Sequence, residues 1–177
     1  MQKKTRTLCL LGLGLAVVAT AALAAAGPKF LRAPSATIEA PTGKLAAGAA
    51  NPTIPVLVVG WTEVGLGNTG TVTYRASADA AAVYQCVNLG TNCPSAANKQ
   101  DVFAKAAVTG TFRIENGRIT GELQLEAPPS TLVCPGNQVV SFASVVFTKI
   151  LLEDVTNGIS AEAKPNSIGY ENQAVCP

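Results

Sequence analysis

The sequence contains no histidine among its 177 residues. This absence excludes Ser-His-Asp and Cys-His catalytic groups, histidine zinc sites and the most common general base. The serine–lysine motif S-x-x-K and the nucleophile motif G-x-S-x-G are missing as well. We therefore predict that the protein is not an enzyme, and that it carries no cofactor and no metal ion.

Aromatic and charged residues are scarce, at 5% and 14% of the chain. One Trp and three Tyr are few for a site that processes carbohydrates. Three of the 13 basic residues lie in the first 26 positions, which leaves 10 basic against 11 acidic residues, a net charge of −1, in the remainder. Because no basic cluster is left to neutralise phosphates, nucleic acid is excluded as a partner.

The first 26 residues have the pattern of a secretory signal peptide. Lys3, Lys4 and Arg6 precede an apolar run over residues 8–19, and small residues that match an A-x-A cleavage site follow. The run is shorter than the roughly 20 residues that a membrane-spanning helix needs. We expect cleavage, no membrane span afterwards, and a secreted or extracellular location, or a periplasmic one if the source has an outer membrane. An uncleaved anchor is the alternative.

Residues 27–55 are rich in Ala, Pro and Gly and show no apolar period. Such a segment buries too little apolar surface to offset the entropy lost on ordering it. We predict a linker or pro-segment here. Residues 56–177 are long enough for one domain with a single core and too short for two.

Residues 106–127 contain the clearest structural pattern, in which apolar and polar residues alternate on both sides of Asn116-Gly117. An Asn-Gly pair favours a type I′ turn, because both central residues of that turn need a positive φ angle. The pattern predicts a β-hairpin with one apolar face. The expected cross-strand pairs are Glu115 with Arg118, Ile114 with Ile119, and Phe112 with Gly121, whose bare backbone the ring would cover.

Further strands are predicted at residues 55–62, 71–78 and 81–87. Residues 139–155 are apolar on both faces, which predicts a long central strand with a bulge, and Asn157-Gly158 then predicts a second turn. About seven strands, with a turn every 8–15 residues, are typical of an antiparallel β-sandwich, either immunoglobulin-like or a similar Greek key. A closed barrel is the alternative.

Four cysteines follow the signal segment: Cys86, Cys93, Cys134 and Cys176. In an exported domain such cysteines are most often disulfide-bonded, and their spacings match neither a zinc site nor a C-x-x-C redox pair. If the strands alternate up and down, all four gather at one end of the sandwich. Neighbouring third and sixth strands favour Cys86–Cys134 with Cys93–Cys176, while Cys86–Cys93 with Cys134–Cys176 stays open.

Four segments, residues 77–99, 110–129, 134–138 and 143–158, together resemble a family of small secreted bacterial proteins. Members of this family have a signal peptide and an all-β domain that contains cysteines. The resemblance spans residues 56 to about 163 and implies a secreted bacterial protein. The family has no assigned activity, so the resemblance transfers no catalytic or ligand-binding residue.

Other motifs have simpler interpretations than a functional one. The run "GLGNTG" at residues 65–70 leads into a strand rather than a helix, which favours a loop over a dinucleotide site. Trp61 is interpreted as a core or rim residue. The carboxylates that we considered for hydrolysis or calcium binding are assigned to a solvated strand face or a hairpin end: Glu115, Glu122, Glu126, Glu153 and Asp154.

We expect an exported, non-enzymatic binding or structural module of the cell envelope or extracellular space, with an unknown protein or cell-wall partner. Loops held by a rigid scaffold are where recognition usually occurs. The predicted contact residues at the cysteine-rich end are Asn88, Asn92, Asn98, Pro128 and Pro129. One alternative is an inhibitor of a secreted hydrolase that presents a disulfide-held loop. A carboxylate-based hydrolase is another, and it needs two converging acidic residues.

Overall fold

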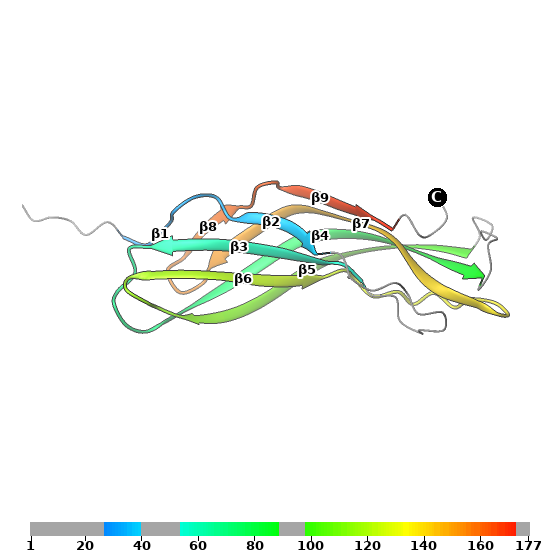
Figure 1. Ribbon diagram of the computed structural model, residues 1–177, viewed down its shortest axis with the longest axis horizontal. Coiled ribbons are helices and arrows are strands. Elements are labelled where there is room, and N and C mark those ends of the chain that lie inside the picture. Colours follow the sequence, from blue (N-terminus) through cyan, green and yellow to red (C-terminus); the bar gives the residue numbers. More distant parts are fainter. Residues whose placement is uncertain (1–26, 40–53, 89–97, 173–177) are drawn as a thin grey trace, which may run out of the picture.

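The computed structural model describes residues 27–39, 54–88 and 98–172, and these form two antiparallel sheets packed face to face (Figure 1). The predicted all-β sandwich is confirmed, although the described residues form nine strands rather than about seven. The strands are β1 (Lys29–Phe30), β2 (Ser35–Glu39), β3 (Val56–Val64), β4 (Thr71–Asn88), β5 (Lys99–Arg113), β6 (Arg118–Glu126), β7 (Gln138–Asp154), β8 (Ile159–Glu162) and β9 (Ser167–Glu171).

The first sheet contains β3 at its centre, with β6 on one edge and both β1 and β2 on the other. The second sheet has the order β5-β4-β7, with β8 and β9 both paired to the free edge of β7. In the described part of the chain, β5 and β6 are therefore edge strands of different sheets. This pairing decides where a groove opens on the molecule.

The structure differs from the predicted linker at residues 27–39, where β1 and β2 extend the first sheet. Ser35 to Glu39 of β2 pair in register with Gly60 to Val56 of β3. Ala36 turns inward and is buried, and its amide donates to the carbonyl of Lys164, which lies between β8 and β9. A five-residue strand with two apolar residues is too short to show a period, so composition alone suggested disorder.

The two strands predicted at residues 71–78 and 81–87 form one strand, β4. Its even-numbered side chains point inward without interruption: Val72, Tyr74, Ala76, Ala78, Ala80, Ala82, Tyr84 and Cys86. The alanine-rich centre has weak β-propensity, and for this reason the sequence analysis predicted two separate strands. In the folded protein these alanines lie in the core between the two sheets.

The predicted bulged central strand is confirmed as β7. Its pairing with β4 shifts register twice, opposite Ser77/Asp79 and opposite Val83/Tyr84. One shift coincides with Lys149, whose φ angle is +53°. Because each bulge reverses the alternation, the inward side chains change parity along the strand: Phe142, then Val145 and Phe147, then Ile150 and Leu152. An apparently two-sided apolar strand thus buries most of its large residues on one face.

The turn predicted at Asn116-Gly117 is confirmed, with φ angles of +52° and +72° and two backbone hydrogen bonds between Glu115 and Arg118. The predicted ladder beyond it is wrong, including the pair Ile114 with Ile119. The two strands separate after the turn, and β5 pairs with β4 whereas β6 pairs with β3. Face-to-face packing buries the apolar face of each strand against the other, which edge-to-edge pairing does not.

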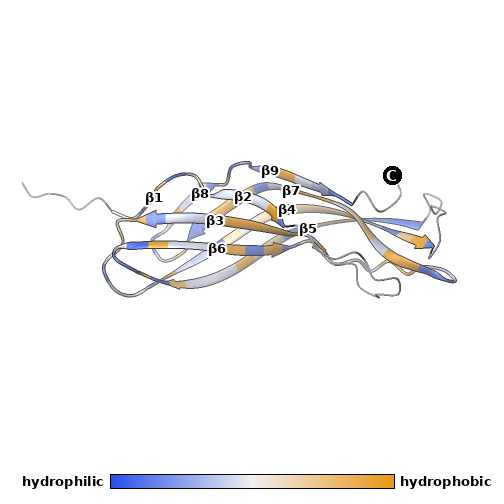
Figure 2. Cartoon of the chain, viewed as in Figure 1, coloured by the Kyte–Doolittle hydropathy of each residue, from blue (hydrophilic) through white to orange (hydrophobic). Residues whose placement is uncertain are grey.

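The core is aromatic at its two ends. Trp61 is buried, and its ring lies 4.6 Å from that of Tyr74 and 5.0 Å from that of Phe112. A Cβ atom placed on Gly121 would lie 2.9 Å from Cε1 of Phe112, so the ring covers this glycine across the sandwich rather than within one sheet. At the other end, the ring of Tyr84 packs against that of Phe142. Figure 2 shows the first half of β3 as one of the most hydrophobic segments.

Candidate functional site

One disulfide bond is present among the described residues, and it joins Cys86 to Cys134 with a Cα–Cα distance of 5.5 Å. This part of the favoured pairing is confirmed, and the alternative Cys86–Cys93 is excluded. Cys93 and Cys176 lie outside the described residues. The bond forms where it does because β4 and β7 are neighbours, with Cys86 opposite Val140. It attaches the end of β4 to the segment that joins β6 to β7.

We call this segment, residues 127–137, the crossover loop, because it carries the chain from the first sheet to the second. Tyr84 Oη donates a buried hydrogen bond of 2.7 Å to the carbonyl of Pro128. Gln100 of β5 accepts from Ser130 Oγ at 2.7 Å and from the Thr131 amide at 3.1 Å, and it donates to Thr131 Oγ1 at 2.8 Å. With the disulfide, these bonds hold the loop at three places.

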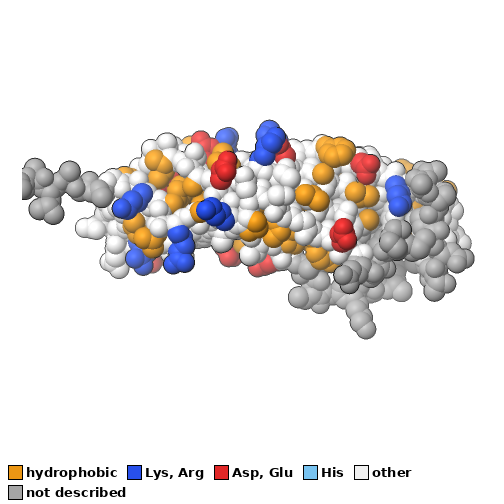
Figure 3. All heavy atoms as spheres, turned by 90° about the horizontal axis from the view of Figure 1, so that it is seen from above, with side chains coloured by type: hydrophobic (Ala, Val, Ile, Leu, Met, Phe, Trp, Pro, Cys, Tyr) orange, Lys and Arg blue, Asp and Glu red, His pale blue; other side chains and the backbone are white. Residues whose placement is uncertain are grey.

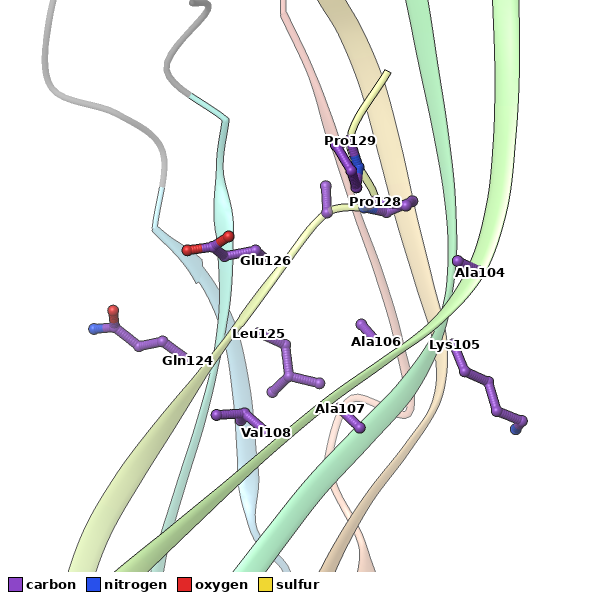
Figure 4. Close-up of a pocket in the computed structure, with 11 residues that line it drawn as sticks. Ala104, Lys105, Ala106, Ala107, Val108, Gln124, Leu125, Glu126, Pro128 and Pro129 are labelled. Carbon is purple, nitrogen blue, oxygen red and sulfur yellow. The ribbon is translucent and has the colours of Figure 1, made fainter. Parts of the chain in front are cut away.

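A groove of about 420 Å³ opens beside the crossover loop, between residues 104–108 of β5 and residues 124–129. It exists because β5 and β6 start together at the Asn116-Gly117 turn and then diverge toward different sheets. In Figure 4 the side chain of Leu125 lies between the two strands, while Gln124 and Glu126 point away from it. On the β5 side, the groove is lined by Lys105 and by small apolar residues.

The chemistry of this groove suits binding rather than catalysis. Its floor is formed by apolar side chains, namely Ala106, Val108 and Leu125. Lys105, on the rim, is directed outward and already pairs with Asp79 at 2.9 Å. Both walls are edge strands, which expose backbone groups that an extended chain can pair with. An extended segment with small or apolar side chains is the ligand that such a groove fits.

The predicted contact residues are only partly brought together. Pro128 and Pro129 both line the groove; Pro129 is exposed, whereas Pro128 is buried and anchors the crossover loop through its carbonyl. Asn98 Nδ2 donates to Gln138 Oε1 at 3.2 Å, so it joins the start of β5 to β7. Asn88 is the exposed last residue of β4, and Asn92 lies outside the described residues. Of the predicted contact residues, only Pro128 and Pro129 line the groove, and the sequence analysis did not predict the groove itself.

Two carboxylates, Glu63 and Asp154, are buried, although the sequence analysis left Glu63 out and considered Asp154 only as part of a hairpin end. Glu63 of β3 accepts a hydrogen bond of 2.7 Å from Tyr74 Oη across the sandwich. Asp154 accepts from the backbone and side-chain nitrogens of Asn157, at 2.9 and 2.6 Å, and so shapes the β7–β8 turn. Neither carboxylate is exposed. The position of Glu63 in β3 could have indicated its burial, because Glu63 continues the series of alternate, inward-facing residues Leu57, Val59 and Trp61.

The pKa of Glu63 is raised to about 7, chiefly because the carboxyl is buried; the Tyr74 hydrogen bond opposes this rise and the nearby Asp154 adds to it. Burial and the bond to Glu63 also raise the pKa of Tyr74, which keeps its hydroxyl protonated as a donor. Among the described residues, Glu63 Oε1 and Trp61 Nε1 have no hydrogen-bond partner. The Tyr74–Glu63 hydrogen bond links the two sheets. Because the side chains of this cluster are buried, a substrate cannot reach them.

The remaining chemical candidates lie apart from one another. Glu115, Glu122 and Glu126 are exposed, as interpreted, while Glu153 pairs with Arg75 at 2.9 Å. The "GLGNTG" run forms the loop between β3 and β4, as predicted. Over the described ranges, no three potential metal ligands come together, and no helix has the length and hydropathy to cross a membrane. Figure 3 shows acidic, basic and hydrophobic side chains together on one long face.

No protein-family model matches this sequence, and neither a curated protein nor a solved structure does. The resemblance to a family of small secreted bacterial proteins therefore stays a prediction.

Proposed function

We propose that the protein is an exported, non-enzymatic binding module that acts at the cell envelope or in the extracellular space. In this proposal residues 1–26 are a signal peptide, and the sandwich is the mature protein. The Cys86–Cys134 disulfide supports export, because such bonds persist in oxidising compartments. The ligand is an extended segment of a protein or cell-wall partner, held in the groove between β5 and β6.

The observation that carries the proposal is the fixed position of the crossover loop over an otherwise open groove. The bonds from Tyr84 and Gln100 and the disulfide order this loop before any ligand arrives. A loop that is already ordered loses little entropy on binding, so more of the interaction energy appears as affinity.

The test is a pull-down with the oxidised mature protein as bait. It is offered washed cell-wall material and concentrated culture supernatant of the source organism, and bound material is identified by mass spectrometry. The variant Ala106→Leu fills the floor of the groove, and Thr109→Leu places the same side chain on an exposed site of β5 outside the groove. Both variants are first compared with wild type by thermal unfolding.

We expect wild type and Thr109→Leu to retain the same material and Ala106→Leu to lose it. Equal retention by a folded Ala106→Leu would place the binding surface elsewhere. Retention of nothing by wild type would refute the binding function and leave a structural role.

One observation favours the inhibitor function as a second candidate. Val133 is 87% exposed and directly precedes the disulfide-bonded Cys134 in the crossover loop. A rigid loop with a protruding apolar side chain can occupy the substrate cleft of a secreted hydrolase. In that case the pull-down captures one soluble hydrolase, Val133→Arg abolishes the capture, and Ala106→Leu preserves it. No observation on the described residues favours a carboxylate-based hydrolase.

A further inference from the structure

The outer face of the second sheet carries an apolar row that crosses four strands. Phe103, Ala81, Val146 and Gly169 occupy successive paired positions on β5, β4, β7 and β9. The exposed fractions of Phe103 and Val146 are 78% and 44%. A shallow hollow of about 480 Å³ lies beside them, because Ala81 and Ala104 contribute little side-chain volume. A projecting phenyl ring next to a hollow is typical of an interaction surface rather than of a solvated sheet.

The rows on either side of the apolar row carry opposite charges. On one side, a row of paired positions runs across β5, β4, β7 and β9 and has an acidic residue at each end. Its members are Asp101, Val83, Ser144 and Glu171. We call this the acidic row. On the other side, Lys105 and Lys149 flank Asp79, and each pairs with it at 2.9 Å. This basic row has two positive charges against one negative charge, and the lysine side chains are at least 80% exposed.

This charge pattern is self-complementary for only one arrangement of two copies. A face-to-face dimer has a two-fold axis that lies in the interface, and each surface meets its own copy. An axis along the strands would place acidic row on acidic row. An axis along the apolar row instead places the acidic row of each copy on the basic row of the other. That second axis also brings the two Phe103 rings together at its end.

We propose that this outer face is a self-association surface, on which a second copy of the chain packs in the arrangement that pairs acidic with basic rows. Phe103, at the β5 end of the apolar row, is the main anchor, because burial of an exposed aromatic ring is the largest hydrophobic gain available on this face. Asp101 of each copy then faces Lys105 of the other. The inference does not depend on the proposed function, because its argument rests on the outer face of the second sheet, which shares only Ala104 and Lys105 with the lining of the groove.

Sedimentation velocity of the oxidised mature protein over a concentration series tests the proposal. Wild type is expected to show a monomer–dimer equilibrium that weakens as salt concentration rises. Phe103→Asp is expected to raise the dimer Kd by at least about tenfold. Val133→Asp is the matched control, because Val133 is at least as exposed and lies on the crossover loop.

A charge reversal distinguishes this arrangement from other dimers. Asp101→Lys and Lys105→Asp each place like charges opposite one another and are expected to raise the Kd, whereas the double variant restores opposite charges and recovers much of the loss. A monomer at every concentration would overturn the proposal, even if Phe103 proved necessary for capture of a different partner. A dimer that Phe103→Asp weakens no more than Val133→Asp does, or a double variant weaker than both singles, would overturn it as well.

Discussion

Glu63 provides the sharpest test of the physical account, because its burial predicts an unusual dependence of stability on pH. The pKa of Glu63 lies at about 7 in the folded protein, against an ordinary value of 4.5. A difference of this size corresponds to about 3 kcal/mol of folding free energy. That is a large part of the total stability of roughly 5–15 kcal/mol that is common for proteins.

The sign follows from which state holds the proton more tightly. Below about pH 4.5 both states are protonated at Glu63, and its contribution to stability is fully present. As pH rises toward 7, the unfolded chain releases this proton first, so the free energy of unfolding falls. Above about pH 7 the folded state ionises as well, and the loss stops growing. The groups that act on Glu63 are Tyr74 and Asp154, both of the other sheet.

The perturbation is Glu63→Gln, which keeps an oxygen acceptor for Tyr74 and cannot ionise. We expect the variant to lose the pH dependence between about pH 4.5 and about pH 7. Relative to wild type, it is expected to gain about 3 kcal/mol on going from acidic to mildly basic conditions. Urea unfolding across this pH range measures the difference, and Glu122→Gln on the exposed face of β6 is the matched control.

Parallel pH profiles for wild type and Glu63→Gln would refute the reasoning, because they would show that the proton on Glu63 is not coupled to folding. Asp79 has the opposite sign, since its lysine partners lower its pKa and its contribution is lost as pH falls. Its effect is present in both proteins and cancels in the comparison.

Three further perturbations have expected outcomes. Cys86→Ser removes a crosslink between residues 48 positions apart, and denaturant titration is expected to show a loss of about 4 kcal/mol; no change in the midpoint would contradict this. Gly121→Ala forces a Cβ to 2.9 Å from the Phe112 ring and is expected to cost about 1–3 kcal/mol in the same assay, whereas Gly67→Ala, with no atom closer than 4.0 Å, costs less. Gln100→Ala is expected to raise hydrogen exchange at the Thr131 amide, which it binds, and an unchanged exchange rate would show that the loop is held by other contacts.

Some features of the fold could be predicted because they depend on neighbouring residues alone. The Asn116-Gly117 turn requires two positive φ angles, and this residue pair adopts them at little cost. Period-two alternation likewise identified β6 and the second half of β5 as strands. The Cys86–Cys134 bond could be predicted because an immunoglobulin-type order makes the cysteine-bearing strand and the strand after Cys134 neighbours.

Other features depend on choices that local sequence does not distinguish. Two amphipathic strands joined by a tight turn can pair at their edges or pack their apolar faces against each other, and the alternation is identical in both cases. Glu63 shows the same limit in the core: its parity places it inward, but only the arrival of Tyr74 and Asp154 from the other sheet explains how a carboxyl is accommodated there.

The separation of β5 from β6 accounts for both surfaces that we propose. If the two strands had formed the expected ladder, the space that is now the groove would have been closed by backbone hydrogen bonds. Because β5 pairs with β4 instead, its inward alanine and valine line the groove, and its outward Phe103 joins the apolar row of the second sheet. One strand therefore contributes to two interfaces, which meet at Ala104 and Lys105. Successive side chains of a strand point to opposite faces of its sheet, so Ala106 and Phe103 lie on opposite faces of β5. Substitutions at these two positions should therefore separate ligand binding from self-association.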